Sequence, residues 1–430
     1  MPQTVTFLPQ QPIVHRTVLD NGIVVLAIEN SAADIIATRI FIRSGSQWEP
    51  REKAGLSHLL SAVITKGTEQ LSAIEIAERI ESVGASLSAD AATDYFLLSL
   101  KTVSADWTEM LQLAGQILLC PSFPETEVEL EQSLTIQDIR SQKEQPFTIA
   151  FDQLRQTMYR DHPYALSILG TEATVSELNR ADLELFHQTH FRPDNIVISV
   201  AGRVTPQEAV TQVEQVFGDW RLPEAPLPIP QLPLITSQPC QVMTPQETQQ
   251  SIVMLGYIAA PLQHADYTTL KLINTYLGNG LSSRLFVELR EKRGLAYDVS
   301  AFYPTRKSAS TFVVYMGTAP DNTEIAIAGL RKEVERIGST RLSIDELQAA
   351  KNKLLGQYAL GKQTNAQLAQ VYGWYETLGL GIDFDIQFQQ DVISITPEIA
   401  QAVATRYFIE PYVSLVGPAE AINPLATPMV

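Results

Sequence analysis

A proline-rich stretch in the middle of the chain limits its possible folds more than any other feature of the sequence. Residues 221–239 contain six prolines and few charges. Proline lacks a backbone N–H and its ring fixes φ, so such a run forms a semi-rigid extended spacer. Domain boundaries fall in stretches of this kind. We therefore predict one domain over residues 1–220, a linker over 221–239 and a second domain over 240–430.

The two halves resemble each other in the order of their elements. Each ends with a helix, an aromatic-proline turn and an apolar strand that closes in glycine, over 191–202 and again over 408–417. Long helices open at 125–131 and 343–349, again about 217 positions apart. Strands and helices are predicted in clusters rather than in strict alternation, which favours α+β layers. The sequence thus predicts two similar α+β domains, each an antiparallel-rich sheet packed against helices.

Local signals predict several elements on either side of the spacer. Two strands, over 85–91 and 94–102, are joined by a tight turn. Further along, the spacing of Thr174 and Glu177 is that of a capping box, which predicts a helix from there to about residue 189. After the spacer, an amphipathic pattern predicts a helix over 281–292, and a strand follows it. Both halves therefore place strands next to helices.

The composition excludes several classes of protein. The formal net charge is −17, whereas nucleic-acid-binding domains need basic patches. No segment reaches the ~18 consecutive apolar residues of a membrane span, and the N-terminus lacks the basic and apolar regions of a secretion signal. Cys120 and Cys240 are too far apart in sequence to define a disulfide framework, which fits a reducing compartment. We therefore expect a cytoplasmic protein without nucleic-acid partners or membrane spans.

Residues 55–68 predict a buried helix with one chemically distinct face. Apolar residues recur there at helical spacing. His58 and Ala62 stand four residues apart and therefore share a face, with Ser61 beside them. A single histidine on such a helix is more often hydrogen-bonded within the fold than bound to a metal.

This stretch resembles the His-x-x-Glu-His zinc motif of the pitrilysin/insulinase family of metallopeptidases, in the branch that includes the mitochondrial processing peptidases. At positions 58–62 this chain has Ser61 in place of the general-base glutamate and Ala62 in place of the second histidine. The resemblance puts Asp138 where the family has its third ligand, a glutamate. Catalytic zinc needs three protein ligands and an open position, and His58 with Asp138 supplies only two. We therefore expect no metal and no other cofactor in this chain.

A second stretch, over 276–303, is similar to the corresponding part of the family's C-terminal domain. In the family, an arginine and a tyrosine seven residues later contact the substrate backbone and the developing oxyanion. That spacing falls on Arg290 and Tyr297, and both side chains donate hydrogen bonds to an oxygen that becomes negative. The residues alone also fit an interpretation without function, in which Arg290 is a solvated cation near a helix C-terminus and Tyr297 is an ordinary strand residue.

The resemblance also implies where a peptide would bind. In the family a substrate peptide pairs, as an added strand, with the strand expected here over 85–91. The family tends to have Asn-Ala on that strand, whereas this chain has Ser88 and Ala89. Strand addition requires only an unpaired backbone edge, so this difference does not abolish it.

Taken together, the resemblance implies a zinc-free subunit that pairs with a zinc-bearing homologous subunit to cleave peptides. Arg290 and Tyr297 would then reach the zinc site of that partner. A non-proteolytic structural or peptide-binding homodimer is one alternative. Another is a hydrolase that uses His58 and Asp138 with a ligand supplied by a partner.

Overall fold

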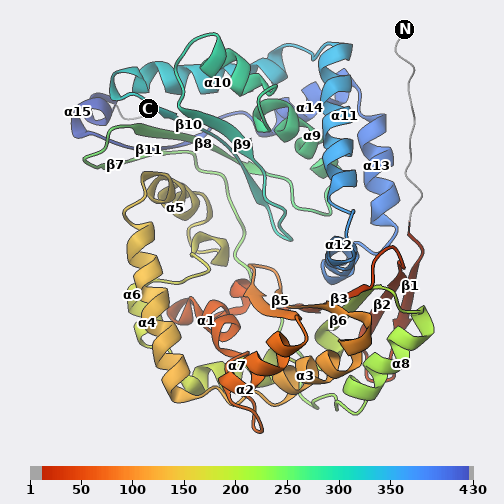
Figure 1. Cartoon of the computed structure of the whole chain (residues 1–430). Helices are drawn as coiled ribbons and strands as arrows, with labels where there is room; N and C mark the ends of the chain where they lie inside the picture. The colour runs from red at the N-terminus through yellow and green to blue at the C-terminus, as the bar shows by residue number, and fades with distance from the viewer. Residues whose placement is uncertain (1–11, 426–430) are drawn as a thin grey trace. The chain divides into compact units, whose positions relative to one another are not determined.

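A computed structural model of the chain describes residues 12–425 (Figure 1). Residues 1–11, on which the expected lack of a secretion signal depends, lie outside the described residues. Contacts divide the chain into two compact units, and each unit includes a segment from the other half of the sequence. The first unit runs to residue 136 and adds 168–230 and 358–384; the second comprises 137–167, 231–357 and the chain from 385 onward. The boundaries of the sequence domains stay a prediction.

The first unit contains a six-stranded mixed sheet. Only β2 and β6 run parallel, and the other neighbouring strands are antiparallel. Among the described strands, β4 pairs with β5 alone and therefore forms one edge of the sheet. The order across the sheet is β1 (Val14–Val18), β2 (Val24–Glu29), β6 (Ile196–Gly202), β3 (Ile35–Ile42), β5 (Phe96–Val103) and β4 (Ser86–Ala91).

Helices cover both faces of this sheet, and one of them comes from the far half of the sequence. One face packs against helices that include α1 (Leu56–Val63), α3 (Trp107–Leu119) and α8 (Pro206–Phe217). Helix α12 (Asn365–Thr377) packs on the other face, against β3 and β6 (Figure 1).

Polar contacts hold both ends of α12 to the first sheet. Near one end, Asn365 Nδ2 donates to the Ile35 carbonyl oxygen at 2.8 Å. Near the other, Glu376 receives two hydrogen bonds from the Arg16 guanidinium, at 2.9 and 3.2 Å. Bidentate pairs of this kind add geometric specificity as well as energy. Helix α12 is therefore an integral part of the first unit.

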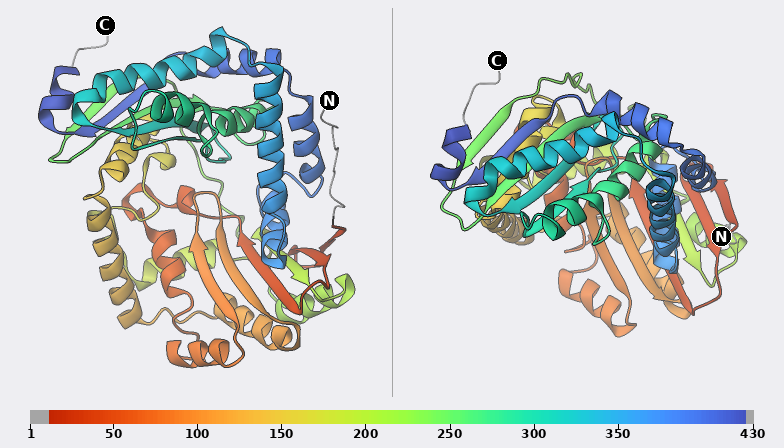
Figure 2. Two further views of the ribbon diagram at one scale, coloured as in Figure 1. Left: turned by 45° about the horizontal axis from the view of Figure 1, so that its top comes forward. Right: turned by 90° about the horizontal axis from the view of Figure 1, so that it is seen from above.

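The second unit repeats this plan with five strands. Its sheet has one parallel pair, β7 and β11, and is otherwise antiparallel. One face packs against α5 (Pro146–Tyr159), which comes from the first half of the sequence. The other face carries α9 (Tyr267–Gly278) and α10 (Thr323–Ser339), with α14 (Pro397–Tyr407) packed beside them (Figure 2). The order is β7 (Gln241–Pro245), β11 (Tyr412–Gly417), β8 (Ser251–Ala259), β10 (Ser310–Thr318) and β9 (Asp298–Phe302).

The predicted fold class is confirmed, since both units are mixed sheets packed against helices. Residues 221–239 form neither helix nor strand. Within residues 12–425, no helix combines the length and the apolarity needed to cross a bilayer. The remaining α-helices are α2 (Ala73–Ser82), α4 (Glu125–Gln142), α6 (Glu172–Ser176), α7 (Arg180–His190), α11 (Ile344–Leu360), α13 (Phe384–Ser394) and α15 (Ala419–Ile422).

The single helix predicted from Thr174 is wrong, because two short helices occupy that segment. Thr171 caps the first helix, α6, by accepting a hydrogen bond from the Thr174 backbone N–H at 3.1 Å. Asn179 caps the second, α7, by accepting from the Asp182 N–H at 3.2 Å. Thr174 thus lies inside the first turn of α6, and its apparent capping box with Glu177 is not formed.

Candidate functional site

Helix α1 carries the degenerate zinc motif, and a carboxylate holds its N-terminus. Glu49 accepts hydrogen bonds from the backbone N–H groups of Gly55, at 2.9 Å, and Ser57, at 2.6 Å. The first N–H groups of a helix have no partner within it, so this carboxylate satisfies two of them. Gly55 has φ +100°, and a Cβ there would lie 2.7 Å from the Leu169 carbonyl oxygen. Burial raises the pKa of Glu49 to about 7.

The motif positions lie on α1 as predicted, but they do not form a zinc site. His58 and Ala62 are both partly exposed, whereas Ser61 is buried. The Ser61 hydroxyl donates to the His58 carbonyl oxygen at 2.7 Å, which commits it to the helix backbone. Ala62 has no donor atom. The residues present therefore do not fit a catalytic zinc, which needs three protein ligands.

The position of the third ligand does not repair this deficit. Asp138, which lies exposed on α4, adds one carboxylate, so that with His58 the chain still offers only two ligands. Among residues 12–425, no group of three or more His, Cys, Asp or Glu side chains is placed to hold a metal ion. The expected lack of zinc in this chain stays a prediction.

The strand expected to bind peptide lies at an edge of the first sheet, next to α1. In β4, Ser88 pairs with Ser99 and Ala89 pairs with Leu98 of β5. Side chains alternate along the strand: Ser88 is exposed, whereas Ala89 packs toward the core. Strand β4 also contacts α1. The first unit thus combines a backbone edge suited to strand addition with the helix of the degenerate motif.

Arg290 lies on an unusual helix in the second unit. The helix predicted over 281–292 is shorter in the structure: after a turn over 281–283 it runs over 284–291, and most of it is a π-helix, η6 (Phe286–Glu291). Apolar spacing predicts a helix there, but it does not determine whether each N–H bonds to the carbonyl four or five residues earlier. Helices of this type are rare and frequently occur at functional sites. The Arg290 side chain is exposed, and its guanidinium lies over the Phe286 ring, 4.9 Å from the centroid.

A glycine turn connects Arg290 to Tyr297. Gly294 has φ +61°, and its N–H donates to the Arg290 carbonyl oxygen at 3.1 Å. The next N–H, of Leu295, donates to the Leu289 carbonyl oxygen at 2.9 Å. These bonds close the π-helix directly behind Arg290.

Strand β10 then anchors the segment that contains Tyr297. The Tyr297 N–H donates to the Gly317 carbonyl oxygen at 2.9 Å, and Thr318 Oγ1 donates to the Leu295 carbonyl oxygen at 2.6 Å. The Tyr297 side chain is 58% exposed and immediately precedes β9, an edge strand. The backbone around both predicted functional residues is therefore well fixed, while their side chains face outward.

Comparisons with known proteins identify the family. A family model described as insulinase (peptidase family M16) matches residues 24–172, and one described as peptidase M16 inactive domain matches 177–354. The chain belongs to the pitrilysin/insulinase family, M16. The family predicted from the motif residues is thus confirmed.

Relatives and solved structures cover nearly the whole chain. An uncharacterized zinc protease of Bacillus subtilis is 25% identical over 415 residues, which are 95% of this chain and 99% of that protein. An uncharacterized zinc protease of Streptomyces coelicolor is 27% identical over 412 residues, 94% and 90% of the two chains. A protease structure from Helicobacter pylori has a TM-score of 0.88 at 21% identity, covering 95% of this chain and 100% of that one. A peptidase M16 inactive domain from Pseudomonas fluorescens has a TM-score of 0.86 at 23% identity, with 94% and 98% covered. The two structures show that the M16 fold is retained.

Two features of this region were not predicted from the sequence. Glu49 lies six residues before Gly55, outside the spacing of a capping box, so no local pattern marks it as the cap of α1. The ion pairs around Arg284 were also missed, although Arg284, Glu288 and Lys292 have the i,i+4 spacing that favours such pairs.

Proposed function

We propose that this chain is the zinc-free subunit of a two-subunit zinc metallopeptidase that cleaves peptides. One observation carries the proposal: the chain keeps Arg290 and Tyr297 exposed on a hydrogen-bonded backbone, while α1 offers one imidazole where a zinc site needs more. A zinc-bearing homologous subunit would supply the metal and the attacking water. This chain would supply hydrogen-bond donors.

The two side chains suit the stabilisation of a developing oxyanion. The Arg290 guanidinium presents several N–H donors in a plane, and the Tyr297 phenol adds an O–H donor. Donors aimed at the charge that develops in the transition state accelerate acyl transfer because they are already oriented. In this proposal Arg290 and Tyr297 bind the substrate backbone and the oxyanion at the zinc site of the partner.

A second candidate function is peptide binding without cleavage, by a homodimer of this chain. The exposed edge of β4 favours it, because strand addition needs backbone N–H and C=O groups and no metal. Ser88 and Ala89 would lie along the added strand. Arg290 and Tyr297 would then contribute to binding at most.

Mixing separates these possibilities. Peptide cleavage is measured with the purified full-length chain alone, with a relative that carries an intact zinc motif alone, and with the two together. Activity that appears only in the mixture supports the zinc-free subunit. Binding without cleavage in any sample supports the peptide-binding homodimer. Cleavage by this chain alone would contradict both and would point to a hydrolase built on His58 and Asp138.

A further inference from the structure

Helix α10 contacts the π-helix through two positions on one of its faces. Gly329 and Glu333 are four residues apart, so they lie on the same side of α10. A Cβ at Gly329 would lie 3.0 Å from Leu289 Cδ2 and 3.1 Å from Arg293 Nη1. The glycine therefore lets the segment that carries Arg290 pack directly against α10.

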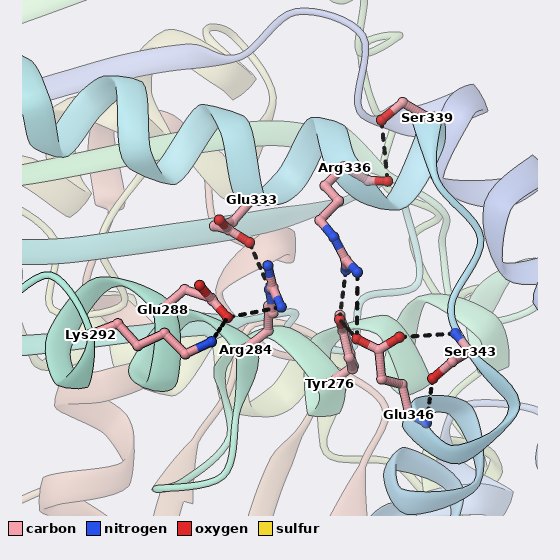
Figure 3. A network of polar contacts seen from close by, with 9 residues as sticks. All are labelled: Tyr276, Arg284, Glu288, Lys292, Glu333, Arg336, Ser339, Ser343 and Glu346. Carbon is pink, nitrogen blue, oxygen red and sulfur yellow. Dashed lines mark hydrogen bonds and ion pairs between the residues drawn. The ribbon is translucent and has the colours of Figure 1, made fainter.

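A chain of charged contacts joins the same two elements, as Figure 3 shows. Arg284 Nε donates to Glu333 Oε2 at 2.7 Å, and Arg284 Nη1 lies 3.0 Å from Glu288 Oε1. Lys292 Nζ donates to the same Glu288 oxygen at 2.7 Å. The Glu333 side chain is 7% exposed and that of Arg284 is 22% exposed. We call these contacts among Arg284, Glu288, Lys292 and Glu333 the clamp. Its Glu333 end is thus buried on α10, and its Glu288 end lies on η6.

The clamp brackets the turn of η6 that presents Arg290. Glu288 and Lys292 lie two residues before and two residues after Arg290. The carbonyl oxygens of Leu289 and Arg290, which lie between Glu288 and Lys292, accept the hydrogen bonds that close the helix before Tyr297. A rotation of η6 on α10 would therefore displace both predicted functional side chains.

A neighbouring set of contacts in Figure 3 provides a matched control. Tyr276 donates to Glu346 at 2.8 Å, and Arg336 donates to Tyr276 at 3.0 Å. Glu346 also accepts a hydrogen bond from the Ser343 N–H at 2.9 Å, at the start of α11. This set joins α9, α10 and α11, and Glu346 makes its hydrogen bonds there rather than with η6.

We propose that Arg284 and Glu333 are positioning residues: their ion pair sets the orientation of η6 on α10 and thereby aims Arg290 and Tyr297. The catalytic part of this inference rests on the proposed function, whereas the structural part does not. The pair can do this because the Glu333 carboxylate is buried on α10 and would lose its charged partner if Arg284 moved away. A shift of about 1 Å in a catalytic group can cost roughly a hundredfold in rate.

Hydrogen exchange of the purified full-length chain tests the structural part. In Glu333→Gln we expect the amides of Gly294, Leu295 and Tyr297 to exchange about tenfold faster than in the wild type, a change equivalent to about 1.4 kcal/mol of opening free energy. In Glu346→Gln these amides should exchange at the wild-type rate. Melting temperatures are measured for both variants, since a general loss of stability would accelerate exchange across the whole second unit. Exchange in Glu333→Gln no faster than in Glu346→Gln would overturn the inference.

A double-mutant cycle with Arg290→Ala tests the catalytic part in the mixed complex. Glu333→Gln should lower kcat by about tenfold to a hundredfold with little change in KM, and Arg284→Lys should lower it less. In the Arg290→Ala background, Glu333→Gln should cause a smaller further loss than in the wild type, since only Tyr297 is left to aim. An equal loss in both backgrounds would show that the pair does not act through Arg290. If no mixture cleaves peptide, the proposed function fails, and the exchange experiment still decides whether the clamp positions η6.

Discussion

The two units share a sheet plan but differ in what they place at its edge. In the first unit, edge strand β4 lies against α1, whose motif positions offer one imidazole, a hydroxyl committed to the backbone and a methyl group. In the second unit, edge strand β9 follows a π-helix and a turn that expose Arg290 and Tyr297. The comparison indicates that the chemical difference between the two edges lies in a few side chains and not in the architecture.

The units also differ in how each accepts a helix from the other half of the sequence. In the first, the glycine that permits close packing is on the incoming helix: a Cβ on Gly373 of α12 would lie 2.4 Å from the Phe41 ring. In the second, it is on the sheet: a Cβ on Gly256 of β8 would lie 2.7 Å from Met158 Sδ of α5. Similar packing is thus achieved by opposite placements of the small residue.

Arg290→Ala should give the largest effect, because it removes the oxyanion donor proposed for the second unit. Loss of one oxyanion donor typically lowers kcat by about 10²–10³, so we expect that loss in the mixed complex with the subunits still associated. Steady-state kinetics and size-exclusion chromatography measure the two quantities. Arg341→Ala, which removes an exposed arginine paired with Glu398, is the control and should leave kcat unchanged. Unchanged turnover in Arg290→Ala would remove the proposed role.

The cap of α1 should make the stability of the first unit depend on pH. Burial raises the pKa of Glu49 to about 7 in the folded chain, above the ordinary value for glutamate. The folded state therefore binds more protons between those two values, and stability from this group falls as pH rises through that window. We expect the difference in unfolding free energy between wild type and Glu49→Gln to change by up to about 3 kcal/mol across it. Urea denaturation at several pH values measures this, and parallel pH profiles for the two proteins would refute it.

A pair of glycine substitutions tests the packing of α12. Gly373→Ala forces a Cβ against Phe41 and should lower the unfolding free energy by about 1–3 kcal/mol. Gly356→Ala, in α11, meets no atom within 4 Å and should raise it by about 0.5–1 kcal/mol through helix propensity. Denaturant unfolding of both variants measures the contrast. Equal effects of the two substitutions would show that α12 does not pack on the sheet as described.

The smallest effect is expected at the edge of β4. If peptide binds by strand addition, backbone groups provide the hydrogen bonds, and Ser88→Ala should change the affinity for a labelled peptide by less than about twofold. Fluorescence anisotropy with the full-length chain gives the dissociation constant. A tenfold loss would mean that the Ser88 hydroxyl recognises the peptide directly.

Much of the fold could be predicted because local patterns carry it. Apolar spacing marked α1 and placed His58 and Ala62 on one face, and the proline run marked a segment without regular structure. The register of η6 could not be predicted, because the same apolar spacing fits an α-helix and a π-helix. Helices α5 and α12 each pack in the unit that the other half of the sequence mainly forms. This packing depends on contacts between residues far apart in sequence, such as Asn365 with Ile35, which no local pattern contains.

The zinc content of the purified wild-type chain tests the central claim most directly. The count of donor atoms on α1 predicts far less than one zinc per chain after dialysis, as measured by inductively coupled plasma mass spectrometry. The double variant Ser61→Glu with Ala62→His, which restores the general-base glutamate and the second histidine ligand, should retain more zinc than the wild type under the same conditions. One zinc per wild-type chain, lost on substitution of His58, would contradict the account.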